Sequence, residues 1–254
     1  MSQILAVANQ KGGVGKTTTS INLAACLAES RKKTLLVDLD SQGNATSGLG
    51  IDKSSLTQCM YDVLVNNVDM ASLIQPTAWK NLWVAPATMN LAGAEIDLID
   101  KKNPANALKK HLNKIRDNYD YVIIDCPPAL SLLTVNALTA ADAVLIPIQC
   151  EFYALEGVTQ LMQTVERIRQ TSNPELKING IVMTMTDTRT HLSNDVVEQV
   201  KSHFPDLIYK TMIPRSVGLG EAPSYGQPIT VYDPRGKAAE AYKALAREAK
   251  RRGK

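Results

Sequence analysis

The segment NQKGGVGKTTTS near the N-terminus has the residue types that bind phosphate. Gly12, Gly13 and Gly15 would let backbone N–H groups curl around an anion. A helix beginning near Lys16 would direct the positive end of its dipole to the same place. The Lys16 side chain would reach the β- and γ-phosphates of a nucleotide, and the Thr17 hydroxyl would ligate Mg²⁺. The segment therefore predicts a nucleotide-binding loop.

Three aspartates follow apolar runs and supply the carboxylates that a metal site needs. Asp125 ends the run YVIID and is expected to hold Mg²⁺ through water. Asp38 and Asp40 lie two residues apart at the end of LLVDLD, so they share one face if that segment is extended. The alternative role for such aspartates is turn formation or capping at the end of a strand.

Apolar runs alternate with helical patterns along the 254 residues and would position these side chains. The strand-like runs are ILAVAN (4–9), TLLVDLD (34–40), NLWVAPA (81–87), YVIIDCPP (121–128), AVLIPIQ (143–149), INGIVMTMT (178–186) and LIYKTMI (207–213). Helical patterns occupy 20–30, 105–117, 153–170 and 193–203. Strands that are apolar throughout indicate a parallel sheet covered by helices on both faces. We expect one α/β domain over residues 1–254, a doubly wound, mostly parallel sheet with its ligand beyond the carboxyl ends of the strands.

The loop departs from the plain pattern GxxxxGK[ST], because Gln10 occupies the position of the first glycine. The segment instead reads KGGVGKTT, the deviant form of the Walker A loop. Here the chain resembles the ParA/MinD family of P-loop ATPases, and specifically the short ParA (Soj-like) partition proteins. The resemblance spans nearly the whole chain, and its further blocks are LLVDLDSQGNATSGLG, YDYVIIDCPPALSLLTVNAL, IPIQCEFYALEGV and IPRSVGLGEAPSYGQPI.

The resemblance implies a role for each polar residue of the site. Lys11, the signature lysine, would reach across an ATP-bound homodimer, where a cation donated in trans would stabilise two facing nucleotides. Contact with phosphate in cis, or with solvent, is the alternative. Asp40 would orient or activate the attacking water, and Asp38 would support the metal site beside Thr17 and Asp125. Hydrolysis should be slow, because these parts supply no strong base. The expected catalytic residues are Lys11, Lys16 and Asp40, and the expected nucleotide contacts in the loop are Lys11, Gly12, Gly13, Val14, Gly15, Lys16, Thr17 and Thr18.

ATP is the expected nucleotide. GTPases of this class recognise guanine through an [NT]KxD segment, and none occurs, since NKIRD (113–117) has the wrong spacing. By resemblance, the IPRSV block passes near the adenine, with Pro214 and Ser216 as contacts. The chain departs from its relatives here, because Ser216, Gly218 and Gly220 stand where they usually have Asn, Arg and Ser. The adenine contact at 216 is therefore less secure, and one basic side chain that might serve DNA is absent.

The expected partner of the dimer is nonspecific double-stranded DNA, bound through phosphate contacts that give affinity without reading sequence. Between residues 236 and 254, seven Lys or Arg stand against two Glu. The candidate DNA contacts are Arg189, Arg215, Lys243, Arg247, Lys250, Arg251 and Arg252. A solvated charged face is the alternative for each. The resemblance also implies a ParB-type partner that stimulates the ATPase through an Arg or Lys in its N-terminal tail.

Other classes of protein are less consistent with the residues. A MinD-like membrane ATPase would end in an amphipathic helix with large apolar residues, whereas KAAEAYKALAREAKRRGK offers mainly Ala with Tyr242 and Leu245. A metabolic enzyme of the nitrogenase iron protein type needs cluster cysteines, and Cys126 beside Asp125 has no convincing partner set. No apolar run approaches the roughly 20 residues of a membrane span. We expect a cytoplasmic, nucleoid-associated protein with no helix-turn-helix extension before the loop.

Overall fold

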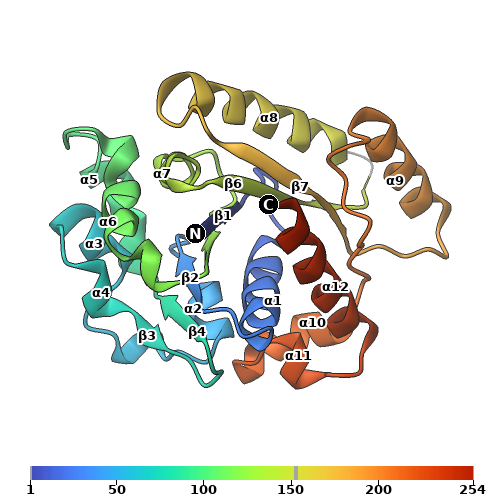
Figure 1. The fold of residues 1–254 in the computed structure, drawn as a ribbon, viewed down its shortest axis with the longest axis horizontal. Helices are drawn as coiled ribbons and strands as arrows, with labels where there is room; N and C mark the ends of the chain where they lie inside the picture. The colour runs from blue at the N-terminus through green and yellow to red at the C-terminus, as the bar shows by residue number, and fades with distance from the viewer. Residues whose placement is uncertain (1, 152–153, 254) are drawn as a thin grey trace.

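The computed structural model describes residues 2–151 and 154–253, and these build one seven-stranded sheet in the order β3-β4-β2-β5-β1-β6-β7 (Figure 1). The strands are β1 (Gln3–Val7), β2 (Thr34–Asp38), β3 (Gln75–Pro76), β4 (Leu82–Ala85), β5 (Tyr121–Asp125), β6 (Ala143–Gln149) and β7 (Lys177–Thr184). Only the short edge pair β3–β4 is antiparallel. The expected doubly wound, mostly parallel sheet is confirmed, and the antiparallel edge is an addition to it.

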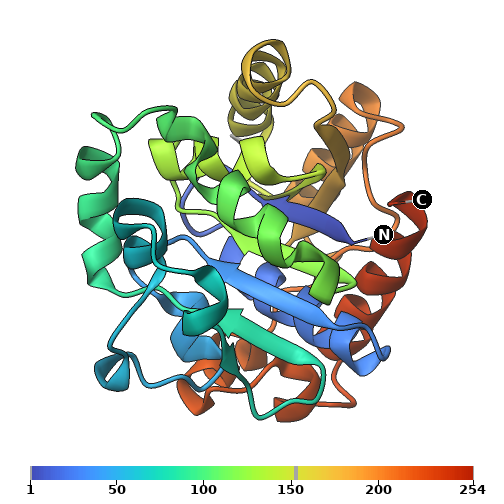
Figure 2. The same ribbon diagram turned by 60° about the vertical axis from the view of Figure 1, so that its left-hand side comes forward.

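Helices cover both faces of the sheet (Figures 1 and 2). They are α1 (Lys16–Glu29), α2 (Asn44–Gly48), α3 (Met60–Asn66), α4 (Met70–Leu73), α5 (Ala94–Asp97), α6 (Ala107–Ile115), α7 (Leu132–Ala140), α8 (Ala154–Thr171), α9 (His191–His203), α10 (Val217–Glu221), α11 (Ile229–Tyr232) and α12 (Lys237–Arg252). Short 3₁₀ turns are η1 (Lys53–Ser55), η2 (Met89–Gly93), η3 (Pro104–Asn106), η4 (Arg116–Asn118) and η5 (Ala222–Tyr225).

Two hydrophobic cores result, one on each face of the sheet. Apolar side chains of α3, α6, α7, α8 and α9 pack against one face, and those of α1, α11 and α12 pack against the other. The central strands are apolar throughout because both of their faces are buried in this way. None of the helices among the described residues is both long enough and apolar enough to cross a bilayer.

The segment 207–213 differs from the sequence expectation of a strand. It runs beside β7, but its pairing there is limited to an isolated bridge between Ile181 and Ile208 and a few backbone hydrogen bonds. Side chains of α12 occupy the backbone groups that a ladder would use. Glu248 accepts hydrogen bonds from the N–H groups of Lys210 and Thr211 at 2.9 and 3.0 Å. Hydrophobicity alone predicted a strand, and a contact from a distant helix prevents it.

Candidate active site

The glycine-rich loop lies between the carboxyl end of β1 and the start of α1. Gly13 and Gly15 have φ values of 75° and 87°, a left-handed region that residues with a Cβ adopt at a cost. Among the described residues no side chain caps the first turn of α1, so its N–H groups remain available to an anion. The loop is therefore shaped to surround a phosphate, as its glycine spacing predicts.

The Lys16 side chain extends across the glycine-rich loop and is held by the backbone of that loop. Its side chain is buried, and Nζ donates a hydrogen bond of 2.8 Å to the carbonyl oxygen of Lys11. Burial lowers the pKa of Lys16, and the nearby charge of Asp125 opposes that shift. The buried ammonium of Lys16 lies beside the uncapped N–H groups of α1. A nucleotide phosphate would add negative charge next to that of Asp125 and would so stabilise the charged form of Lys16.

Strand register brings two of the three predicted carboxylates together. Asp38 on β2 pairs with Asp125 on β5 in adjacent positions of the parallel ladder, and both side chains are fully buried. Oδ1 of Asp125 accepts a hydrogen bond of 2.8 Å from Ser20, and the nearby Thr17 hydroxyl opposes the rise in the pKa of this carboxylate. Oδ2 of Asp125 is buried with no hydrogen-bond partner.

These carboxylates fit a divalent cation. Burial first, and then the charge of Asp38, raises the pKa of Asp125 to about 8, and burial raises that of Asp38 to about 6. A cation would offset both effects and would satisfy the unpartnered oxygen of Asp125. Within the described ranges no group of three or more His, Cys, Asp or Glu could hold a metal by itself. Mg²⁺ would therefore need the Thr17 hydroxyl, waters and phosphate oxygens, which is its usual mode of binding.

Thr46 positions Asp38, which the sequence did not indicate. Oδ2 of Asp38 accepts hydrogen bonds from the Thr46 N–H at 2.8 Å and from its hydroxyl at 2.7 Å. Oδ1 accepts one of 3.1 Å from the N–H of Asp40. The same Thr46 hydroxyl accepts a bond of 2.9 Å from the N–H of Ala87. Asp38 thus binds the backbone of both Asp40 and Thr46, so it orients the loop between these residues, the Asp40 loop, as well as lining the metal site.

Asp40 lies at the mouth of the site, 9% exposed. Its Oδ1 accepts a hydrogen bond of 2.9 Å from the N–H of Gln42. The carboxylate is therefore fixed in direction, and only a small part of the residue reaches solvent. This is the arrangement that positioning a water molecule requires.

Lys11 and Glu151 form an ion pair that the sequence did not predict. The Lys11 Nζ lies 2.8 Å from Oε2 of Glu151, and the two side chains are 38% and 46% exposed. The backbone of Lys11 is also held, because its N–H donates to Oδ1 of Asn9 at 3.0 Å. Asn9 in turn donates to the carbonyl of Pro147 at 2.7 Å. Lys11 is thus directed away from Lys16 and toward the segment after β6.

A pocket of about 220 Å³ adjoins the end of the loop and contains both predicted adenine contacts, Pro214 and Ser216. Gly15 and Thr18 line it from the loop side. Tyr242 of α12 also lines it, 1% exposed, with its hydroxyl 3.3 Å from that of Thr19. The pocket is large enough for a planar base, and Tyr242 is a lining residue that sequence reasoning did not select.

The predicted DNA contacts differ in how exposed they are and in whether they pair with an acidic side chain. Arg189 is 86% exposed but pairs with Asp187 at 2.7 Å, and Lys243 pairs with Glu240 at 3.0 Å. Arg215, Arg247 and Arg251 are exposed, and Lys250 is half-buried.

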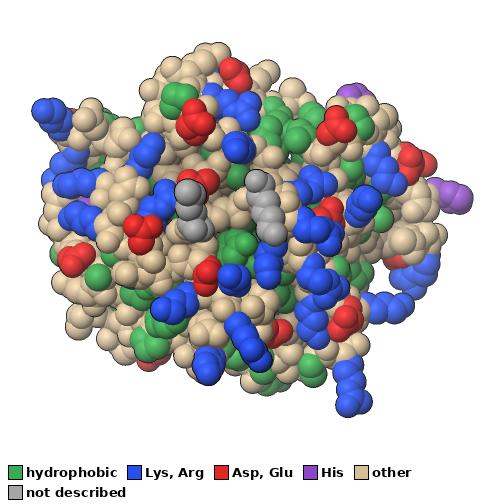
Figure 3. Space-filling model, viewed as in Figure 1, with side chains coloured by type: hydrophobic (Ala, Val, Ile, Leu, Met, Phe, Trp, Pro, Cys, Tyr) green, Lys and Arg blue, Asp and Glu red, His purple; other side chains and the backbone are tan. Residues whose placement is uncertain are grey.

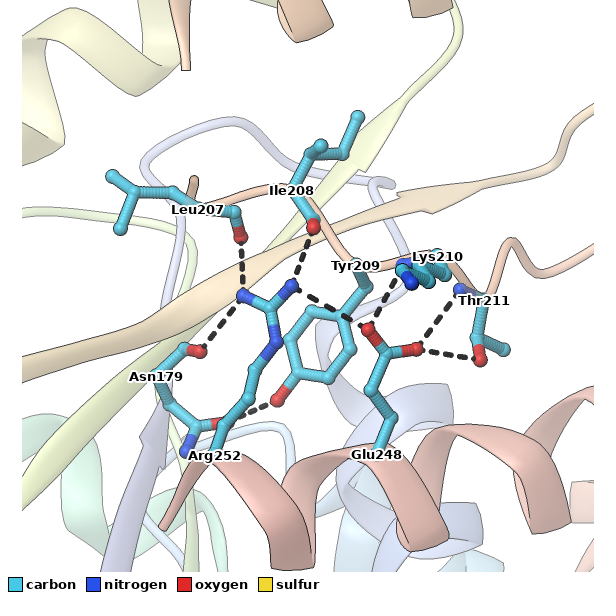
Figure 4. A network of polar contacts seen from close by, with 8 residues as sticks. All are labelled: Asn179, Leu207, Ile208, Tyr209, Lys210, Thr211, Glu248 and Arg252. Carbon is cyan, nitrogen blue, oxygen red and sulfur yellow. Dashed lines mark hydrogen bonds and ion pairs between the residues drawn. The ribbon is translucent and has the colours of Figure 1, made fainter. Parts of the chain in front are cut away.

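Arg252 corrects the sequence expectation (Figure 4). Its guanidinium donates to the carbonyl oxygens of Asn179, Leu207 and Ile208 and lies 4.3 Å from the centre of the Tyr209 ring. Glu248 adds a contact at 3.4 Å. Both terminal nitrogens of the guanidinium, Nη1 and Nη2, are engaged in these contacts. Arg252 therefore fastens the end of α12 to the segment after β7, and we remove it from the DNA-binding set.

Comparison with known proteins finds relatives that match nearly the whole chain. A family model described as an AAA domain matches residues 2–178. The sporulation initiation inhibitor protein Soj of Bacillus subtilis is 56% identical over 98% of each chain. The chromosome partitioning protein ParA of Myxococcus xanthus is 49% identical over 99% of this chain and 89% of its own. A solved structure described as cobyrinic acid a,c-diamide synthase from Mycobacterium smegmatis, with bound ADP and magnesium, is 39% identical with a TM-score of 0.86, covering 97% of this chain and 93% of that one.

Proposed function

This chain belongs to the Soj/ParA family of chromosome-partitioning ATPases, and from that premise we propose that it is an ATP-driven dimerising switch. ATP and Mg²⁺ bind at the carboxyl edge of the sheet, two copies close over the two nucleotides, and the dimer binds DNA without regard to sequence. Hydrolysis reopens the dimer and releases the DNA. Residues 1–254 act as one ATPase domain in this scheme.

The observation that carries the proposal is the different placement of the two lysines of the loop. Lys16 is buried and spans its own loop, which suits the nucleotide of the same chain. Lys11 is half-exposed and pairs with Glu151 at the surface. An exposed ion pair contributes little stability. The phosphate of a nucleotide bound to a second chain could therefore replace Glu151 as the partner of Lys11 at a small cost in free energy. Two facing nucleotides repel one another, and an ammonium from each side would offset that repulsion.

The remaining residues support slow hydrolysis. When bound, Mg²⁺ would neutralise charge on the β- and γ-phosphate oxygens. Thr17 and Asp125 would hold it, Asp38 would keep the Asp40 loop in place, and Asp40 would orient the attacking water. Asp40 is a weak base near a solvent-exposed mouth, so basal turnover should be low. A ParB-type protein that supplies an Arg or Lys would then raise it by stabilising charge in the transition state.

DNA binding is assigned to the basic residues that remain after Arg252 is removed. Arg247, Lys250 and Arg251 lie on α12, the helix whose Tyr242 lines the base pocket. Arg215 lines that pocket and precedes α10, and Arg189 and Lys243 complete the set. The helix α12 thus carries both a residue of the base pocket and proposed DNA contacts. ATP in the pocket could therefore control DNA binding through this helix. Association with the nucleoid would follow.

Two alternatives have specific features to weigh. A membrane-bound ATPase would need a free apolar face on α12, but Tyr242 and Leu245 are buried against α1. Similarity to the solved synthase favours a second candidate, an enzyme that forms an amide from an organic acid. Such an enzyme would use ATP only with its organic acid present. Dimerisation with ATP alone would favour the switch.

The proposal is tested by measuring the molar mass of the chain in solution with ATP and Mg²⁺, using Asp40→Ala to slow hydrolysis. We expect a dimer with ATP and a monomer with ADP. Lys11→Ala in the same background should remain monomeric although it binds ATP. Lys33→Ala, which removes an exposed lysine outside the loop, should dimerise like its parent. A Lys11→Ala chain that dimerises normally would refute the role of Lys11 in trans.

A further inference from the structure

A second pocket, of about 470 Å³, lies between α3, η3 and α6 and shares no residue with the base pocket or the glycine-rich loop. Figure 2 shows α6 at the front of the molecule, beside α3 and α5. Leu64, Val65 and Leu98 form an apolar wall, and the rest of its lining is basic or amide except for Pro104 and Ala107. A pocket of this volume accommodates a small molecule.

The charge of this pocket has one sign. Lys101, Lys102 and Lys110 line it, and its described lining includes no Asp or Glu. Figure 3 shows Lys and Arg side chains gathered over α5 and α6. Lys110 is held in place, because its Nζ donates a hydrogen bond of 3.0 Å to Oδ1 of Asn67. Three ammonium groups around one opening attract a multivalent anion.

His111 gives independent evidence that the pocket is built for a ligand. It lines the pocket, is 2% exposed, and its Nδ1 is buried with no hydrogen-bond partner among the described residues. A buried polar atom without a partner costs free energy, and a bound ligand would remove that cost.

The charge state of His111 agrees with this arrangement. Burial, followed by the charges of Lys114 and Lys110, lowers its pKa, while Asp69 opposes the shift. A neutral imidazole at pH 7 can donate one hydrogen bond from its protonated nitrogen, and an entering anion would raise its pKa.

We propose that this pocket binds a small multivalent oxyanion, of phosphate or carboxylate chemistry, through Lys101, Lys102, Lys110 and the ring of His111. The apolar wall would contact the carbon skeleton of the ligand. The pocket shares no residue with the glycine-rich loop, so its ligand would bind separately from ATP. An acidic peptide is the competing occupant, and it would use only the lysines because it could not place a group against the buried Nδ1.

The test is NMR titration of the histidine rings of the full chain, with pyrophosphate and with citrate at constant ionic strength. The chain has three histidines, so His111 is assigned by comparison with His111→Asn. Lys16→Ala is used throughout to weaken phosphate binding at the nucleotide loop. We expect a saturable shift of the His111 signals with a rise in its pKa. Response to pyrophosphate alone would identify a phosphate site, response to citrate alone a carboxylate site, and response to both a general oxyanion site.

Charge reversal supplies the matched control. Lys102→Glu should weaken binding about tenfold or more, because it replaces attraction by repulsion at the mouth. Lys109→Glu makes the same change on α6 outside the pocket lining and should leave binding nearly unchanged. Equal weakening by both variants, or no shift of His111 with either anion, would overturn the proposal. A shift caused only by an acidic peptide would also overturn it. Because Lys16→Ala removes ATP binding, these outcomes do not depend on the proposed switch.

Discussion

Arg251 and Arg252 are neighbours at the end of α12 but should have different roles, one in binding DNA and the other in stabilising the fold. Arg252 donates to three backbone carbonyls and lies over the Tyr209 ring, whereas Arg251 is exposed. Gly180 permits this close packing, since a Cβ there would lie 2.6 Å from Nη1 of Arg252. We expect Arg252→Ala to destabilise the fold and Arg251→Ala to weaken DNA binding.

The magnitude follows from the contacts. Hydrogen bonds from a charged group and a partly buried cation–π contact together contribute about 2 to 4 kcal/mol to the free energy of unfolding. For a chain of this size that loss lowers Tm by about 5 to 15 °C. Arg251→Ala should change the free energy of unfolding by less than about 0.5 kcal/mol. It should lower the salt dependence of DNA binding by about one phosphate contact per chain.

Two measurements on each variant separate these roles. Circular dichroism during heating gives Tm without nucleotide, and fluorescence anisotropy with ATP gives the DNA affinity of the folded protein at a temperature well below Tm. Arg252→Lys keeps the charge but loses the planar fork of donors, so it should also destabilise the chain. If Arg252→Ala has the same Tm as the wild type and weakens DNA binding, then Arg252 does not fasten α12 to the segment after β7 and its assignment is wrong.

Three further predictions concern the nucleotide site. Lys16→Ala should abolish ATP binding measured by calorimetry, and intact affinity would undercut the phosphate assignment. Glu151→Gln should release Lys11 in both chains and lower the protein concentration needed for ATP-dependent dimerisation by up to about thirtyfold, because two exposed pairs, one per chain, contribute at most about 2 kcal/mol together; an unchanged midpoint would show that the pair does not restrain Lys11. The raised pKa of Asp125 means that the folded chain keeps a proton which the unfolded chain releases, so the free energy of unfolding without nucleotide should fall as pH rises from about 4 toward about 8. Urea titrations at several pH values test this, and a flat profile would contradict the burial of an uncompensated carboxylate.

Much of the architecture could be predicted because it depends on local patterns. Continuous apolar runs gave the parallel sheet, and the glycine spacing placed the loop before α1. Parallel register then brought Asp38 beside Asp125, since both aspartates end neighbouring strands.

The missed features depend on contacts between residues far apart in the chain. Thr46 stands out only once it is seen to donate to Asp38, and Glu151 only once it is seen beside Lys11. Tyr242 reaches the base pocket because α12 packs on α1, which its own sequence cannot show. Arg252 illustrates the same limit, because a basic tail does not reveal which of its side chains fold inward.

The most direct test of the switch is binding to a random-sequence DNA duplex, measured by fluorescence anisotropy with ATP, with ADP and without nucleotide over a series of salt concentrations. The proposal predicts tight, salt-sensitive binding with ATP and weak binding in the other two states. Equal binding in all three states would contradict it, because nucleotide would then have no control over DNA.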